Sequence, residues 1–338
     1  MKVAEIRGVR QAGLVDRDEP FAAGDIVKIQ TRAIPMCTEW RAWQQGRASD
    51  TLGHEAIGVV VDAAESRRVA VGDRVIVMPQ AGCGNCASCR AGEHIHCLSP
   101  RDLLAETGST SGIGCYGEFL IKPDYLLMQV PEDISTRHAG MAICGLGPSF
   151  TATRRMRVSA EDVVLVSGCG AVGLGAIVNA RALGARVIAL ELQPFRGSLA
   201  ASLGAATVLD PRDTDIAARV AELTNGRGVD AAIETSNTES GASMVQQLTR
   251  PRGRIAFVSW TGRVEVPQLV GKGHEIYGCW HWNHQEHGAD MMDLVRRVGP
   301  SLDLLLTHTF DFTDFEDAFR VQETGDCGKI LLSIGEPS

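Results

Sequence analysis

A glycine-rich loop that directly follows an apolar segment constrains the fold of this chain more than any other feature. Residues 163–167, Val-Val-Leu-Val-Ser, form a β-branched run typical of a buried strand. The loop is Gly168-Cys169-Gly170-Ala171-Val172-Gly173, and apolar residues then recur from Leu174 to Ala182 as on one face of a helix. In such a unit Gly168 permits the tight turn, Gly170 lets the backbone approach a pyrophosphate and Gly173 allows close packing of helix on strand. The segment therefore predicts a dinucleotide-binding loop whose helix N-terminus faces the phosphates.

The end of the next predicted strand bears on which dinucleotide is bound. Residues 187–190 are apolar, and Glu191 follows them roughly 20 residues after the loop. A carboxylate at this place accepts hydrogen bonds from the adenosine ribose and repels a 2′-phosphate. Arg196, which follows in the next segment, is compatible with NADP. The sequence therefore predicts NAD, bound with the help of Glu191 and Arg196, and keeps NADP as the less favoured alternative.

Two patterns divide the chain. From residue 162 to 259 short apolar strands alternate with helical stretches, which implies βαβ units and a parallel sheet. The first 150 residues or so read instead as short strands and turns, and the tail ends in the apolar run 329–334. We therefore predict an α/β protein in which a doubly wound parallel sheet, residues 148–280, is inserted into a β-rich domain made of residues 1–147 and 281–338.

Composition limits the partners and the compartment. The 338 residues carry a formal net charge of −8, which argues against a surface built to neutralise nucleic acid. No apolar run approaches the roughly 18 residues that span a bilayer. The segment Met1–Arg7 has charges where a signal peptide needs its apolar stretch. We expect a cytoplasmic protein with a small-molecule substrate and without membrane or nucleic-acid partners.

Four cysteines are clustered within residues 82–98. They are Cys83, Cys86, Cys89 and Cys97, with the spacing C-x2-C-x2-C-x7-C. Four thiolates on a short lobe can close a tetrahedron around Zn²⁺, and a closed set stabilises a lobe without performing chemistry. Iron–sulfur clusters use similar spacings, so they remain an alternative. His94 and His96 flank the last ligand and are alternatives to Cys97, which completes the more regular set.

Three further residues of ligand type stand far apart in the sequence: Cys37, His54 and Cys144. Their spacing does not show that they converge, because a lone buried cysteine is more often a small core residue. A lone histidine is likewise more often a structural residue. The residues alone leave a second metal site open.

The chain as a whole resembles the zinc-containing medium-chain dehydrogenases/reductases, the group of alcohol, sorbitol and threonine dehydrogenases. The resemblance covers nearly all 338 residues and rests on Gly53-His54-Glu55 with Gly58, on Val71-Gly72-Asp73-Arg74-Val75, on the four-cysteine lobe, on the glycine loop with Glu191, and on Gly328-Lys329. It implies a GroES-like catalytic domain with an inserted Rossmann domain. It also implies a homodimer or homotetramer.

The resemblance assigns roles to the isolated ligand residues. Cys37, His54 and Cys144 would hold a catalytic zinc with a vacant fourth position, and Glu55 would lie near the metal. Together with the four-cysteine site this gives two zinc ions per chain. The implied activity is hydride transfer between NAD and a secondary alcohol, polyol or sugar-type substrate, or its ketone or aldehyde. Apart from the resemblance, Lys329 is expected to contact cofactor phosphate, as a point charge near an anion.

The sequence departs from the family after Cys37, where the pattern is C-x-[ST]-D and this chain has Thr38-Glu39. Either Glu39 replaces the hydroxyl residue, or the segment is one residue shorter and Thr38 and Glu39 stand for threonine and aspartate. We favour the second interpretation, with Thr38 as the hydroxyl that takes the alcohol's proton. Ala42 stands where the family often has a relay histidine, which leaves the further proton route open.

Two other functions compete with this one. The first is a quinone or enone reductase of the same fold without catalytic zinc, and the second is a non-enzymatic redox sensor that binds zinc and nucleotide. His281, His284 and His287 suggest a third metal site, but a strand edge followed by a polar loop is the favoured interpretation of that segment.

Overall fold

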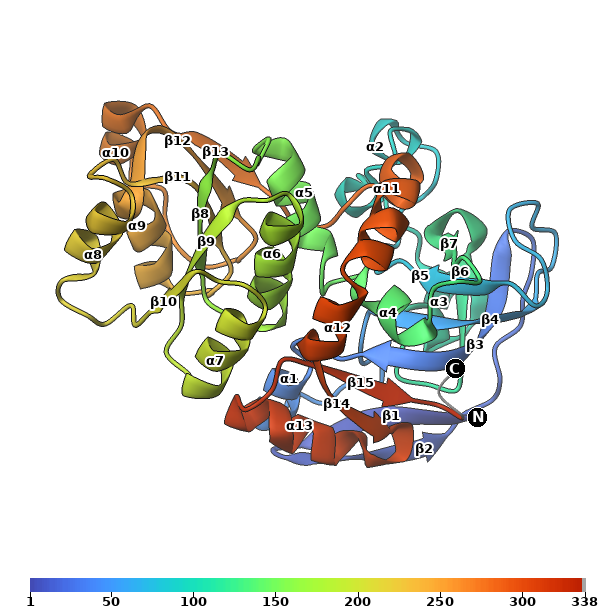
Figure 1. Ribbon diagram of the computed structural model, residues 1–338. Helices are drawn as coiled ribbons and strands as arrows, with labels where there is room; N and C mark the ends of the chain where they lie inside the picture. The colour runs from blue at the N-terminus through green and yellow to red at the C-terminus, as the bar shows by residue number, and fades with distance from the viewer. Residues whose placement is uncertain (336–338) are drawn as a thin grey trace. The chain divides into compact units, whose positions relative to one another are not determined.

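The computed structural model describes residues 1–335, and the chain divides into two compact units (Figure 1). The first unit comprises Met1–Ile143, Asn283–Arg296 and the segment that begins at Leu306. The second comprises Cys144–Trp282 and Arg297–Leu305. Each unit has its own sheet.

The first unit is built on a seven-stranded sheet. In spatial order its strands are β14 (Leu306–Asp311), β15 (Lys329–Ser333), β3 (Ile26–Pro35), β4 (Ala56–Asp62), β5 (Arg74–Val77) and β7 (Leu127–Gln129), with β6 (Phe119–Pro123) also paired to β3. Neighbouring strands are antiparallel except β14 and β15. A separate hairpin joins β1 (Lys2–Gly8) to β2 (Gln11–Asp16). Because β15 pairs with β3, the end of the chain completes the sheet that its beginning starts.

Short helices and an aromatic cluster surround this sheet. The helices are α1 (Trp40–Gln45), α2 (Ala87–Arg90), α3 (Leu103–Thr107), α4 (Thr136–Met141), α11 (His284–Arg297) and α13 (Phe315–Thr324), with single 3-10 turns at His94–His96, Thr110–Gly112, Asp124–Leu126 and Phe312–Asp314. Trp43 of α1 packs on Phe319 of α13 with ring centroids 5.8 Å apart. Tyr116 packs against both Phe315 and Phe319. These side chains are almost fully buried, and they fix α1 and α13 to the sheet.

The second unit is a parallel six-stranded sheet with helices. The strand order is β10 (Thr207–Leu209), β9 (Arg186–Leu190), β8 (Val163–Ser167), β11 (Val229–Glu234), β12 (Thr249–Phe257) and β13 (Glu275–Gly278). The helices are α5 (Gly147–Arg155), α6 (Ala171–Ala182), α7 (Pro194–Ser202), α8 (Ile216–Leu223), α9 (Glu239–Leu248), α10 (Val266–Lys272) and α12 (Gly299–Leu305). The strand order reverses between β8 and β11, where nucleotides bind in such folds. The predicted doubly wound parallel sheet is confirmed.

The unit boundaries lie close to the expected ones but differ at one helix. The chain passes between units at residues 143/144 and 282/283, against the expected 147/148 and 280/281. Arg297–Leu305 groups with the second unit, whereas we expected residues 281–338 to stay together. The physical reason is that α12 packs on α6 and α7, and Leu302 and Leu305 are buried.

Within the described residues, every helix is too short or too polar to cross a bilayer.

Candidate metal and nucleotide sites

The three ligand-type residues that are far apart in the sequence come together, and Glu55 joins them. Cys37, His54, Glu55 and Cys144 each offer one ligand atom, and these atoms all lie within 4.8 Å of one another. Cys37 follows the end of β3, and His54 and Glu55 directly precede β4. Cys144 is the residue that directly follows Ile143, where the first unit ends. Two thiols, an imidazole and a carboxylate form a donor set that suits Zn²⁺.

The carboxylate of Glu39 contacts the Nδ1 atom of the His54 ring. Glu39 Oε1 lies 3.0 Å from His54 Nδ1, and Glu39 Oε2 accepts a hydrogen bond from the Cys37 backbone N–H at 2.9 Å. A carboxylate on one ring nitrogen fixes the tautomer and orientation of a histidine that ligates metal through the other. Glu39 therefore supports a ligand, and the interpretation that the segment after Cys37 is one residue shorter stays a prediction.

The electrostatics of the cluster favour positive charge. Burial lowers the pKa of His54, but hydrogen bonds to Cys37 and Glu39, and the charges of these groups, outweigh it and raise the pKa to about 12. Burial alone would raise the pKa of Glu39, but the hydrogen bond and charge of His54 lower it. Surroundings that hold a proton so firmly on an imidazole also attract a divalent cation in its place.

Lys329 is paired with Glu55. Its Nζ donates to Glu55 Oε1 at 2.6 Å, and neither side chain has any exposed surface. In this structure Lys329 therefore forms an ion pair beside the metal ligands, and its contact with cofactor phosphate stays a prediction. Burial raises the pKa of Glu55 to about 7, against the opposing charge of Lys329.

Thr38 is exposed to solvent, whereas Ala42 is partly buried against the hydrophobic core of the first unit. Thr38 is exposed directly after Cys37, and its carbonyl accepts from the Arg41 N–H at 3.0 Å in the turn that starts α1. Ala42 lies within α1 and carries no group that exchanges a proton. The relay role of Thr38 remains a prediction.

The four clustered cysteines also converge. The ligand atoms of Cys83, Cys86, Cys89 and Cys97 lie within 4.8 Å of one another, and two sulfur pairs are 3.9 Å apart. A tetrahedral ion with bonds of about 2.3 Å to sulfur separates its sulfurs by about 3.8 Å, so the set fits one zinc ion. Backbone N–H groups donate to these sulfurs and, more than any other cause, lower the pKa of Cys86 to about 6, which favours the thiolate.

The histidines beside this lobe stay outside the group of ligands. His94 is buried and stacks on Tyr125 at 5.5 Å between ring centroids, while His96 is exposed. Among the described residues only two groups have the spacing of a metal site, and neither contains His281, His284 or His287. His284 Nε2 instead contacts the Tyr125 carbonyl at 2.9 Å. The predicted strand edge is β13, which ends at Gly278, but the expected polar loop gives way to helix α11 at His284, so His284 and His287 lie on a helix.

The glycine loop has the close packing that its sequence predicts. Gly168 has φ of +85°, and a Cβ on Gly173 would lie 1.9 Å from the Gly168 carbonyl oxygen. By contrast, a Cβ on Gly170 would meet no described atom within 4 Å. Helix α6 starts at Ala171 and continues through Val172, so its first N–H groups lie at the loop. The loop therefore leaves open the place where a pyrophosphate would approach.

Glu191 lies against this loop. Its Oε2 accepts from the Cys169 N–H at 2.6 Å, and its Oε1 accepts from the Leu192 and Gln193 N–H groups at 2.8 Å. Burial and the charge of Glu191 raise the pKa of Cys169, and the charge of Arg196 opposes them. Both residues expected to face the adenosine end are therefore close to the loop.

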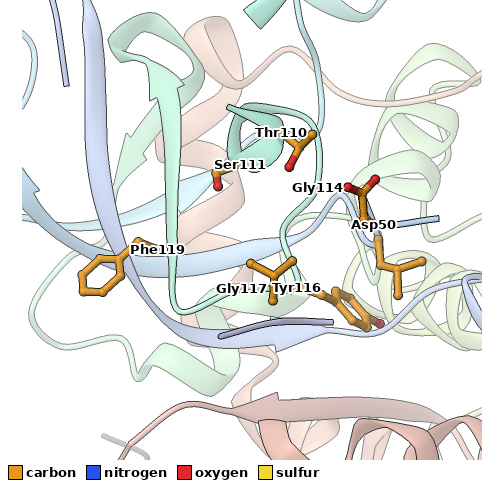
Figure 2. Close-up of a pocket in the computed structure, with 9 residues that line it drawn as sticks. Asp50, Thr110, Ser111, Gly114, Tyr116, Gly117 and Phe119 are labelled. Atoms are coloured by element: carbon orange, nitrogen blue, oxygen red, sulfur yellow. The ribbon is translucent and has the colours of Figure 1, made fainter. Parts of the chain in front are cut away.

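A cavity beside Tyr116 is not a substrate site. Figure 2 shows it in the first unit, lined by Asp50, Thr110, Ser111 and Tyr116 among others. Its volume is about 10 Å³, which is room for about one water molecule. The Tyr116 ring packs so closely on Gly53 that a Cβ there would lie 2.3 Å from it, so Tyr116 supports the residue before His54.

Comparisons with known proteins identify the family of this chain. Residues 10–132 match the alcohol dehydrogenase GroES-like domain, and residues 171–297 match the zinc-binding dehydrogenase domain. L-threonine 3-dehydrogenase of Pyrococcus horikoshii is 28% identical over 338 residues, covering 96% of this chain and 95% of that protein. An uncharacterized zinc-type alcohol dehydrogenase-like protein of Escherichia coli K12, YphC, is 31% identical over 294 residues, covering 83% of this chain and 80% of that protein.

Solved structures share the fold over almost the whole chain. Alcohol dehydrogenase TADH from Thermus sp. ATN1 superposes with a TM-score of 0.88 at 21% identity, covering 99% of this chain and 100% of that one. The 2R,3R-butanediol dehydrogenase from Bacillus subtilis gives a TM-score of 0.83 at 24% identity, covering 99% of each chain. Both domain matches, the YphC similarity and the two cysteine-containing clusters point to one family. The chain belongs to the zinc-type medium-chain alcohol dehydrogenases, a family of oxidoreductases that act on alcohols.

Proposed function

We propose that this protein transfers hydride between NAD and a secondary alcohol, polyol or sugar-type substrate, or its ketone or aldehyde, with the help of a catalytic zinc ion. The observation that carries the proposal is the convergence of Cys37, His54, Glu55 and Cys144 within 4.8 Å. Without such a cluster, a reductase of the same fold that lacks catalytic zinc would explain the chain as well.

In this proposal Cys37, His54 and Cys144 hold the zinc. When bound there, zinc supplies a Lewis acid for the substrate oxygen. Glu39 keeps His54 oriented, and the ion pair with Lys329 gives the Glu55 carboxylate a partner other than the metal. Three protein ligands leave one position for substrate, as catalytic zinc sites require.

Thr38 is the proposed proton acceptor. Its hydroxyl directly follows Cys37 and is exposed, so it can hand a proton from the alcohol to solvent. Since Ala42 carries no titratable group, the proton passes from Thr38 to water rather than through a histidine.

The second unit binds NAD in this proposal, and NAD supplies the hydride acceptor. The 168–173 loop and the N-terminus of α6 face the pyrophosphate, and Glu191 accepts from the ribose. Glu191 disfavours a 2′-phosphate, so NAD is preferred over NADP although Arg196 lies near. The four-cysteine lobe holds a second, structural zinc.

We also propose that the chain forms a homodimer or homotetramer. Strand β13 is an edge of the sheet that the described residues form, and none of the residues of the neighbouring α10 is buried. Val266 and Val270 of α10 are 62% and 75% exposed. A strand edge with apolar side chains beside it favours pairing with another chain.

The test is a screen of NAD reduction over secondary alcohols, polyols and hydroxy amino acids. Threonine belongs in the screen because relatives are named L-threonine 3-dehydrogenases. We expect at least one compound to reduce NAD, and Cys37→Ala to abolish that activity. Activity that survives in Cys37→Ala removes zinc from the chemistry, whereas tight NAD binding without any reduction favours a redox sensor.

A further inference from the structure

Glu234 is a buried carboxyl at the carboxyl end of the central strand β11. All six residues of this strand are buried, and Glu234 has no exposed surface. Across the ladder it pairs with Ser167, the last residue before the glycine loop. A buried carboxyl is costly unless hydrogen bonds satisfy it, so its partners indicate what it is for.

The partners of Glu234 form one tight turn. Glu234 Oε1 accepts from Ser236 Oγ at 2.6 Å and from the Asn237 N–H at 3.1 Å. Asn237 has φ of +58°, in the left-handed region that local hydrogen bonds must stabilise. Burial raises the pKa of Glu234, while hydrogen bonds from Ser236 and Ser167 lower it. The carboxyl therefore organises residues 236–237 from inside the sheet.

This turn packs directly on the glycine loop. A Cβ on Gly168 would lie 2.6 Å from Ser236 Cα, so the backbones of the two segments are in contact. Thr235 Oγ1 donates to the carbonyls of Ser167 and Gly168 at 2.9 and 2.7 Å. A shift of residues 235–237 would therefore move Gly168 and the loop after it.

We propose that Glu234 is a positioning residue for the nucleotide loop: it fixes the Ser236–Asn237 turn, the turn fixes Gly168, and dinucleotide affinity depends on Glu234 without contact between them. The inference rests on the proposed binding of NAD at residues 168–173. Glu234 is separate from the metal ligands, so its effect falls on cofactor affinity and on the KM for NAD rather than on kcat.

The experiment is calorimetric titration of the zinc-loaded enzyme with NAD. Glu234→Ala is expected to raise the Kd about tenfold, the scale of one or two lost hydrogen bonds. Glu234→Gln is expected to bind close to wild type, because its amide oxygen still accepts from Ser236 and Asn237. The KM for NAD is expected to follow the Kd while kcat changes little.

Asp230 provides a matched control on the same strand. It is buried near the amino end of β11 and accepts from the Val163 N–H at 2.9 Å and from Arg250 Nε at 2.7 Å. Asp230→Ala is expected to lower the melting temperature and leave the Kd for NAD unchanged. The inference is overturned if Glu234→Ala binds NAD like wild type, or if Asp230→Ala weakens binding as much.

A further variant, Ser236→Ala, keeps the test decisive if Glu234→Ala folds poorly. Ser236→Ala is expected to raise the Kd for NAD in the wild-type background. Where Glu234→Ala folds, Ser236→Ala is expected to add nothing to its effect, because both changes act through one turn. An unchanged Kd in folded Ser236→Ala overturns the inference. Absence of NAD binding by the wild-type enzyme overturns the proposed cofactor itself, whereas normal binding by Glu234→Ala overturns only the positioning role.

Discussion

The contact between Glu39 and His54 decides how well the cluster presents an imidazole to a metal. Removing it by Glu39→Ala frees the ring, and loss of such a carboxylate typically costs 10–100-fold in metal affinity. We expect Glu39→Ala to lose zinc to a chelator at concentrations that wild type withstands. Glu323→Ala is the control, because this carboxylate binds Arg10 and Gln44 and belongs to neither group of possible metal ligands. Equal zinc retention by the two variants would contradict the role of Glu39.

The buried pair of Lys329 and Glu55 is a second feature at this scale. Breaking one partner of a buried pair typically costs about 3–5 kcal/mol, because an uncompensated charge remains. We expect Lys329→Met to lower the melting temperature of the metal-loaded enzyme strongly, and Lys329→Met/Glu55→Gln to restore much of it. A single variant as stable as wild type would show that the pair contributes nothing.

Single residues also show what the sequence can and cannot predict. Four cysteines within residues 83–97 predict a metal site by spacing alone, because a short lobe brings them together. Cys37, His54 and Cys144 needed the family resemblance, since nothing in their spacing shows convergence. Lys329 and Glu55 are 274 positions apart, and no local signal pairs them, so the sequence could not reveal that ion pair.

At the scale of elements, substitutions of two glycines in one loop are expected to have different effects on stability and on NAD binding. A Cβ on Gly173 would lie 1.9 Å from the Gly168 carbonyl oxygen, so Gly173→Ala must displace α6 from β8 and lower both stability and NAD binding. A Cβ on Gly170 would meet no described atom, so Gly170→Ala should keep its melting temperature and lose only NAD affinity. Thermal denaturation and NAD titration of both variants test this. A Gly170→Ala variant that binds NAD normally would place the pyrophosphate elsewhere.

Elements differ in how far their sequence fixes their place. Strand β8 is apolar up to Ser167, and β11 is apolar between Asp230 and Glu234, as parallel strands covered on both faces require, and the sheet was predictable for that reason. The place of helix α12 in the fold was not predictable, because Leu302 and Leu305 indicate only that one face of the helix is buried. The face that receives them, on α6 and α7, is set by packing between distant segments.

At the scale of the whole molecule, the exposed face of α10 is expected to join chains. Val270→Glu places a charge on a side chain that is 75% exposed, so a monomer should tolerate it while a chain interface should not. Light scattering after size-exclusion chromatography should report a lower mass for Val270→Glu than for wild type. Val71→Glu, at a valine 66% exposed in the first unit, is the control and should keep the wild-type mass. Identical masses for all three proteins would remove α10 from the interface.

The central claim is that one metal site holds a catalytic zinc ion and the other a structural one. Counting the zinc ions bound per chain tests it most directly. Elemental analysis of the purified enzyme should give two zinc ions per chain for wild type and for Cys115→Ala, whose buried thiol belongs to neither cluster. Cys37→Ala should hold one zinc ion, keep its fold through the four-cysteine lobe and lose alcohol-dependent NAD reduction. A Cys37→Ala enzyme that still holds two zinc ions, or still oxidises alcohol, would contradict the account.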